Sequence, residues 1–205
     1  MSSRQQLEER LNTYSHALGI VLSIIGFGYF LNLNLTRSLL IPIVVYSISL
    51  IVLFTSSTLY HAVSNPKVKK RLRVLDHISI YYLIAGTYTP MCYHILENSK
   101  GALLLWLVWG IAIFGTVLKL FFTGRFEVFS LILYGVMGWL IVIDLPFLIA
   151  NVSSNVLMYL ALGGAFYTIG ILFYAVKKIP FNHFIWHLFV LSGAWMHWVM
   201  TEMIV

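Results

Sequence analysis

Residues 39–61 read "LLIPIVVYSISLIVLFTSSTLYH", an apolar segment without a charged residue that ends in His61. A helix needs roughly 20 apolar residues to cross the hydrocarbon core of a bilayer, which is about 30 Å thick. Residues 39–59 alone are long enough to cross this core. The whole chain has the same character, with 60% hydrophobic and only 10% charged residues among 205, whereas a soluble domain is typically about a quarter charged. The composition therefore predicts an integral membrane protein.

Seven such apolar runs follow one another, and they predict one domain, an all-α seven-transmembrane-helix bundle. Strands are excluded because an open sheet leaves backbone groups unpaired in lipid, and the runs lack the alternation of a membrane barrel. Asp144 and Pro146 make the end of the fifth run ambiguous. It either continues to residue 150 or ends near Ile143 before a short re-entrant or interfacial piece. The predicted spans are about 15–33, 39–59, 78–95, 103–122, 126–150, 156–176 and 184–204.

The ends of the chain and its basic residues predict the orientation. The polar start is not followed by a short apolar core with a cleavage site, so we expect no removable signal peptide. Cytoplasmic loops retain an excess of Lys and Arg. With the N-terminus cytoplasmic and the C-terminus external, eleven of the 13 basic residues lie inside, and only Arg37 and Lys100 lie outside. The basic run "KVKKRLR" (67–73) then marks topology and attracts anionic lipid headgroups. We expect membrane lipids and no nucleic acid as partners, and the oligomeric state stays open.

Polar side chains gather at the predicted inner ends of the spans. An ionisable group inside a membrane costs a few kcal/mol and usually marks a cavity or a site. Four segments that are far apart in the sequence bring such groups to one layer. The group consists of Glu8, Glu9, Asn12, His16, His61, Asp76, His77, His183 and His187.

The spacing within this layer favours a metal site. His183 and His187 are four residues apart, as are Ser57 and His61, so each pair projects from one helix face. Three histidines with one open position are typical of zinc sites, and a nearby carboxylate can take a proton from water. Zinc suits imidazole, and the layer has no thiolate. The alternative is that these histidines are interfacial and hydrogen-bond to backbone or headgroups.

His197 is interpreted separately. It lies ten residues beyond His187, about 15 Å along a helix. This distance is too large for the same set of metal ligands. We expect it to line a cavity or to form a hydrogen bond between helices.

Four motifs together resemble a known family, the bacterial hemolysin III proteins, which are grouped with the progestin and adipoQ receptors and, more distantly, with the alkaline ceramidases. The resemblance implies a seven-helix protein of the bacterial plasma membrane with a cytoplasmic N-terminus. It implies zinc bound by His61, His183 and His187, with Ser57 and Asp76 matching the family's serine and aspartate. The motifs are "EERLNTYSHALG" (8–19), "SSTLYH" (56–61), "LDHISIYYLIAGTYTP" (75–90) and "HFIWHLFVLSGAWMH" (183–197).

The resemblance and the polar layer lead to one main expectation and two alternatives. The expected function is zinc-dependent hydrolysis of a lipid amide or ester from the inner leaflet, in membrane lipid homeostasis. Asp76 would act as general base, and Ser57 would donate a hydrogen bond to the zinc-bound water or to the developing oxyanion. Glu9, Asn12, His16, His77 and His197 are further polar candidates. The alternatives are a cytolytic, membrane-permeabilising protein, and a non-enzymatic sensor of membrane state with structural zinc.

Overall fold

Nine helical segments and no strand make up residues 3–205, the part of the chain that this computed structural model describes. Three of the segments, α5, η1 and α6, follow one another directly and replace a single fifth helix. The predicted all-α bundle of seven long helical segments is therefore confirmed. The bounds are α1 (Ser3–Leu31), α2 (Arg37–Ala62), α3 (Pro66–His94), α4 (Gly101–Phe122), α5 (Glu127–Trp139), η1 (Leu140–Asp144), α6 (Leu145–Asn151), α7 (Ser154–Ala175) and α8 (Asn182–Ile204).

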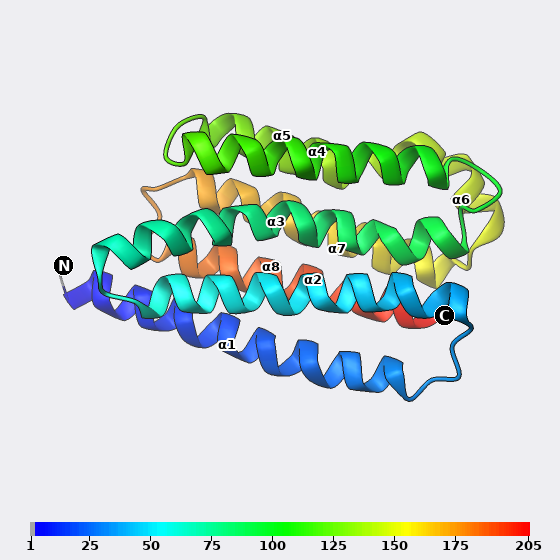
Figure 1. Ribbon diagram of the computed structural model, residues 1–205, viewed down its shortest axis with the longest axis horizontal. Coiled ribbons are helices and arrows are strands. Elements are labelled where there is room, and N and C mark those ends of the chain that lie inside the picture. The colour runs from blue at the N-terminus through cyan, green and yellow to red at the C-terminus, as the bar shows by residue number, and fades with distance from the viewer. Residues whose placement is uncertain (1–2) are drawn as a thin grey trace.

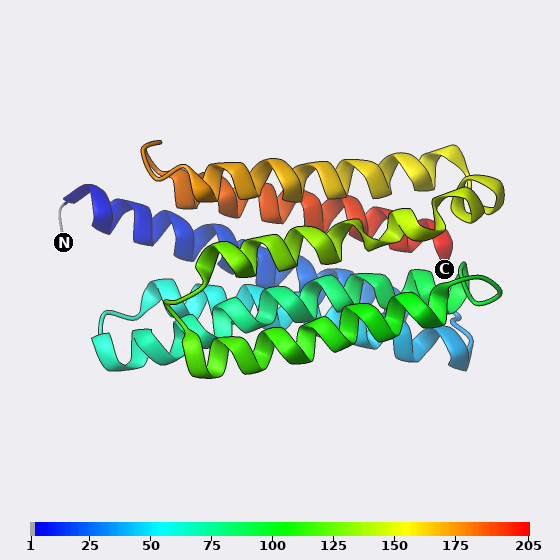
Figure 2. The same cartoon turned by 90° about the horizontal axis from the view of Figure 1, so that it is seen from above.

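The long helices run up and down along one axis, with the two termini at opposite ends of the bundle (Figure 1). α2 packs against both α1 and α3, and α7 packs against α8. Seen from above, α5 passes between α4 and α7 (Figure 2). This arrangement brings the start of α1, the end of α2 and the starts of α3 and α8 to one end.

Five helical segments are long and apolar enough to cross a membrane: α1, α2, α4, the stretch from α5 through α6, and α7. The other two long helices are α3 and α8. α3 begins with the basic run 67–73 and continues with Asp76 and His77, while α8 carries three histidines. The two long helices that are not apolar enough by this measure are thus among those that supply the polar layer.

Helix starts follow local sequence. The side chain of Asn65 accepts hydrogen bonds from the backbone N–H groups of Lys67 and Val68, at 3.0 and 3.3 Å, and Pro66 is the first residue of α3. Both features are typical of a helix N-terminus. α3 therefore begins 12 residues before the predicted span at residue 78, so its first turns carry the basic run.

The break between α5 and α6 is stabilised by side chains from α3 and from the loop after it. The hydroxyl of Tyr88 donates to the carbonyl of Gly138 at 3.1 Å and accepts from the N–H of Ile141 at 2.8 Å. Asp144 accepts hydrogen bonds from the Ser99 hydroxyl and the Lys100 N–H. Backbone groups freed at membrane depth need such partners. The fifth segment is thus interrupted before Asp144.

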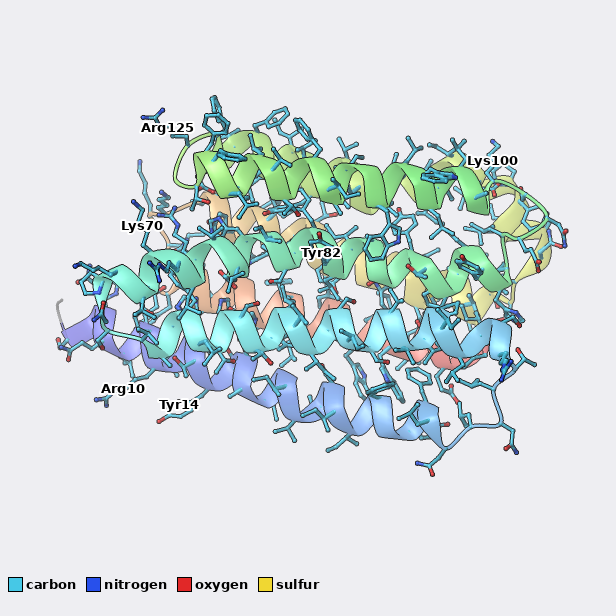
Figure 3. All side chains as sticks on the ribbon, in the orientation of Figure 1. Arg10, Tyr14, Lys70, Tyr82, Lys100 and Arg125 are labelled. Atoms are coloured by element: carbon cyan, nitrogen blue, oxygen red, sulfur yellow. The ribbon has the colours of Figure 1, made fainter. Side chains whose placement is uncertain are left out.

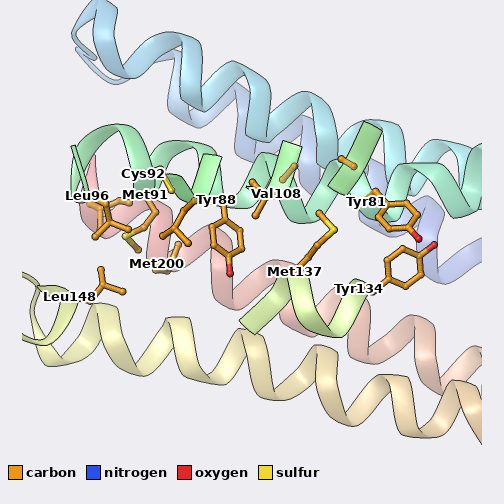
Figure 4. Close-up of a cluster of buried hydrophobic side chains, with 14 of the residues drawn as sticks. Tyr81, Tyr88, Met91, Cys92, Leu96, Val108, Tyr134, Met137, Leu148 and Met200 are labelled. Carbon is orange, nitrogen blue, oxygen red and sulfur yellow. The ribbon is translucent and has the colours of Figure 1, made fainter. Parts of the chain in front are cut away.

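A core of buried side chains fills the space between α3, α4, α5 and α8 (Figure 4). The rings of Tyr81 and Tyr134 lie with their centroids 4.4 Å apart at one end of it. Small residues let helices approach closely in membranes. Gly115 faces the ring of Tyr81, and Gly163 faces the ring of His197, where any larger side chain would collide.

Candidate metal centre

His61, His183 and His187 come together in the structure. Each offers one ring nitrogen, and these three atoms lie within 4.8 Å of one another. His61 lies in the last turn of α2, and the other two lie in the first two turns of α8. The four-residue spacing places the α8 pair on one face, with ring centroids 4.8 Å apart. The three histidines predicted as ligands therefore form one cluster, which we call the histidine trio.

Partners on α1 orient two of these rings. The Nδ1 atom of His61 lies 2.9 Å from the carboxylate of Glu9, and the Nδ1 atom of His187 lies 3.3 Å from the carbonyl oxygen of Asn12. A ring that donates from Nδ1 keeps its Nε2 lone pair for a metal. The Nε2 atom of His61 is buried, and no side chain or backbone group of residues 3–205 bonds to it. The donor set thus fits a metal ion, and imidazole donors suit zinc.

Further polar residues of α1 surround the trio. The ring of His16 stacks on that of His187, with centroids 3.6 Å apart and planes 10° from parallel. The Ser15 hydroxyl lies 3.4 Å from Nδ1 of His187. Glu9 also pairs with Lys69 of α3 at 2.9 Å. The residues predicted at the inner mouth of the first span, Glu9, Asn12 and His16, therefore all contact the trio.

Substituting Glu9 with glutamine tests the role of this carboxylate. The change removes the charge that holds His61 by its Nδ1 atom, and loss of such a partner typically costs about 10- to 100-fold in metal affinity. Competition with a coloured zinc chelator would measure the affinity. Glu8→Gln is the matched control, because it removes the same charge from a different face of α1. Equal affinities in the two variants would contradict an orienting role for Glu9.

Asp76 and Ser57 lie next to each other beside the trio. Both side chains are buried, Asp76 in the first half of α3 and Ser57 near the end of α2. Ser57 lies one helical turn before His61, so it faces the same side of α2. Asp76 and Ser57 also line the same cavity as His16, His183 and His187. A buried carboxylate thus lies at the edge of a candidate metal site.

The cavity has a volume of about 450 Å³ and a mostly apolar wall. Its polar end holds Asp76, Ser57 and two members of the trio, His183 and His187, and aliphatic and aromatic side chains line most of the remainder. It follows α3 from Asp76 to Met91, about 22 Å along the helix. Trp139, which is 52% exposed, lines it and donates from its Nε1 to Thr168 of α7. The cavity therefore reaches the surface between α5 and α7.

His197 and His77 lie away from the trio. The Nε2 atom of His197 is 3.3 Å from the carbonyl of Leu160 on α7, and its ring lines the cavity beyond the polar end. His77 also lines the cavity, but its Nδ1 atom lies 3.6 Å from Glu127 at the start of α5. Both histidines contact neighbouring helices rather than the candidate metal ligands.

An ionic cluster around Glu127 was not predicted from the sequence. Glu127 pairs with Lys119 at 3.0 Å and with Arg73 at 3.1 Å, which joins α3, α4 and α5. We counted Lys119 with the loop residues, but it lies inside α4 and is only 1% exposed. One feature of the sequence could have indicated this cluster: a lysine in an apolar run is followed, across a short turn, by a glutamate eight residues later.

Comparison with known proteins shows the family. The Haemolysin-III related family matches residues 4–198. "Hemolysin-3" of Bacillus cereus and "Hemolysin-3 homolog" of Bacillus subtilis (strain 168) are each 40% identical over 190 residues, which cover 91% of this chain and 87% and 89% of those proteins. "Monocyte to macrophage differentiation factor" of Homo sapiens is 31% identical over 199 residues, 93% of this chain and 82% of that protein. The resemblance carried by the four motifs is confirmed, and the chain belongs to the Haemolysin-III related family of multi-pass membrane proteins.

Proposed function

We propose that this protein is a zinc-dependent hydrolase that cleaves an amide or ester bond of a membrane lipid. One observation carries the proposal: two members of the histidine trio, His183 and His187, line the polar end of a long apolar cavity together with Asp76 and Ser57. The trio provides a metal site, and the carboxylate provides a base. The apolar wall, open between α5 and α7, suits an acyl chain that enters from the bilayer.

The chemistry divides between the metal and the residues of this chain. Zinc, when held by His61, His183 and His187, supplies a Lewis acid that polarises the carbonyl and acidifies water. Asp76 takes the proton of the attacking water as the new C–O bond forms. Asp76 then returns this proton to the leaving nitrogen or oxygen as that bond breaks. Ser57 holds the carboxylate in position, and the products are a fatty acid and an amine or alcohol.

The substrate is placed in the inner leaflet, because we assign the end with the trio to the cytoplasm. Arg10, Lys70 and Arg125 lie at this end, and Lys100 lies at the other (Figure 3). An excess of basic residues marks the cytoplasmic side. A cytoplasmic N-terminus follows from this assignment.

Metal removal and return test the proposal. Purified protein in detergent is treated with a strong chelator, and release of fatty acid from a ceramide and from a matched ester is measured before and after zinc is restored. Hydrolysis is expected to fall to the background rate and to recover with about one zinc per chain. Hydrolysis that persists in metal-free protein would overturn the proposal. A lower melting temperature without product from any lipid would favour structural zinc and a sensor.

Membrane permeabilisation is a second candidate function, favoured by the names of the two Bacillus relatives. It predicts dye leakage from liposomes that contain the purified protein. Leakage should exceed that from liposomes with another seven-helix protein at equal density. If the chain is instead a hydrolase alone, the dye stays inside while the lipid is consumed.

A further inference from the structure

We propose that a second pocket, beside His183, binds an anionic headgroup, so that the ligand of this protein is an amphiphile with a phosphate or similar group. The statement about the substrate rests on the proposed hydrolase function, whereas the binding pocket does not. The pocket has a volume of about 300 Å³ and lies at the end of the bundle that holds the trio. Its walls include Tyr60, Arg73, His77, Tyr174, Lys177 and His183.

The charge in this pocket is positive. Arg73 and Lys177 line it, and no acidic side chain does. Arg73 pairs with Glu127 through one of its terminal nitrogens. Lys177 is exposed in the turn between α7 and α8, and no acidic residue among residues 3–205 lies within ion-pair distance of it. An anion between these two cations would accept charge-assisted hydrogen bonds, which are roughly twice as strong as neutral ones.

The pocket and the apolar cavity share three lining residues. His77 and His183 line both spaces. The ring of Tyr174, 5.5 Å from that of His183, also lines both. An amphiphile with its chain in the apolar cavity and its headgroup between Arg73 and Lys177 would therefore place its linkage beside His183 and Asp76. This geometry selects a lipid whose charge is close to the bond that is cut.

Binding of a non-hydrolysable pair of lipids tests the proposal. Hexadecyl phosphate and hexadecanol share one chain and differ only in the headgroup. They are added to metal-free protein in a neutral detergent, and unfolding is followed with a thiol-reactive dye, since the single cysteine, Cys92, is buried. Hexadecyl phosphate is expected to bind about tenfold more tightly than hexadecanol. Equal affinities would overturn the proposal.

Two charge-matched variants show where the anion binds. Lys177→Gln is expected to remove most of the tenfold preference, while Lys178→Gln, which removes the same charge next to the pocket, should keep it. An equal loss in both variants would mean only a general attraction to the basic end, and would contradict the pocket. Inorganic phosphate is the third probe. If it binds as tightly as hexadecyl phosphate, the ligand is free phosphate rather than a lipid.

The result is independent of the hydrolase test, because no metal and no bond cleavage are involved. A protein that hydrolyses lipids without the headgroup preference refutes only the pocket. A protein that shows the preference but never releases a product refutes only the hydrolase.

Discussion

Substitution of His187 with alanine is expected to abolish zinc binding and hydrolysis together. Two histidines would remain, and the loss in affinity should exceed the roughly 10- to 100-fold expected for removing an orienting partner such as Glu9. Zinc per chain, measured by elemental analysis of protein purified in detergent, should fall from about one to background. Fatty acid release from a ceramide should disappear with it.

Two further variants separate metal loss from misfolding. His183→Ala removes a less buried member of the trio and should have the same effect on zinc. His197→Ala removes a buried histidine from the same helix, outside the trio, and should keep the metal. Circular dichroism and size-exclusion chromatography establish that each variant is folded. Normal zinc content in folded His187→Ala protein would show that the trio is not the metal site.

The sequence predicts the helices well because the bilayer imposes length and composition on each of them. A run such as 39–59 has few alternatives when every backbone group must be satisfied within its own segment. The fifth segment is different. It breaks where the hydroxyl of Tyr88, about 50 residues earlier in the chain, satisfies the backbone of Gly138 and Ile141. A contact of this kind depends on tertiary packing, which no local pattern contains.

For the candidate site too, the sequence predicted which residues share a layer but not which side chains touch. The depth of each span and the four-residue spacing on α8 are properties of the sequence, and they brought His61, His183 and His187 to one layer. The rotation of each helix about its axis is not such a property. The bond between Glu9 and His61 and the stacking of His16 on His187 depend on that rotation. The sequence therefore predicted Glu9 and His16 as neighbours without assigning their contacts.

Lys119 shows a different limit. A lysine close to the end of an apolar run is usually assigned to the membrane surface, because its long side chain can reach water. Here the side chain stays inside and meets Glu127 of the next helix. Whether such a lysine extends to water or turns inward depends on a partner that the turn between α4 and α5 brings close. Counting the basic residues on each side of the membrane could not distinguish a lysine that reaches water from one that turns inward.

Substitution of Asp76 with asparagine is expected to lower hydrolysis about 10²- to 10⁴-fold, the usual contribution of a general base, while zinc content stays unchanged. The asparagine has nearly the same shape and keeps an oxygen that can accept a hydrogen bond, but it cannot take a proton from water. The measurement is the rate of fatty acid release per mole of bound zinc. This ratio separates a missing base from a missing metal.

Asp144→Asn provides the matched control. Asp144 is the other aspartate buried in the described helices, and it lies at the opposite end of the bundle, where it binds Ser99 and the Lys100 N–H. Its substitution should lower stability, because charge-assisted hydrogen bonds are lost, yet the rate per folded, zinc-loaded molecule should not change. If Asp76→Asn protein turns over as fast as Asp144→Asn protein, another group must take the proton. The histidine trio would then bind its metal for a purpose in which Asp76 is only a structural neighbour.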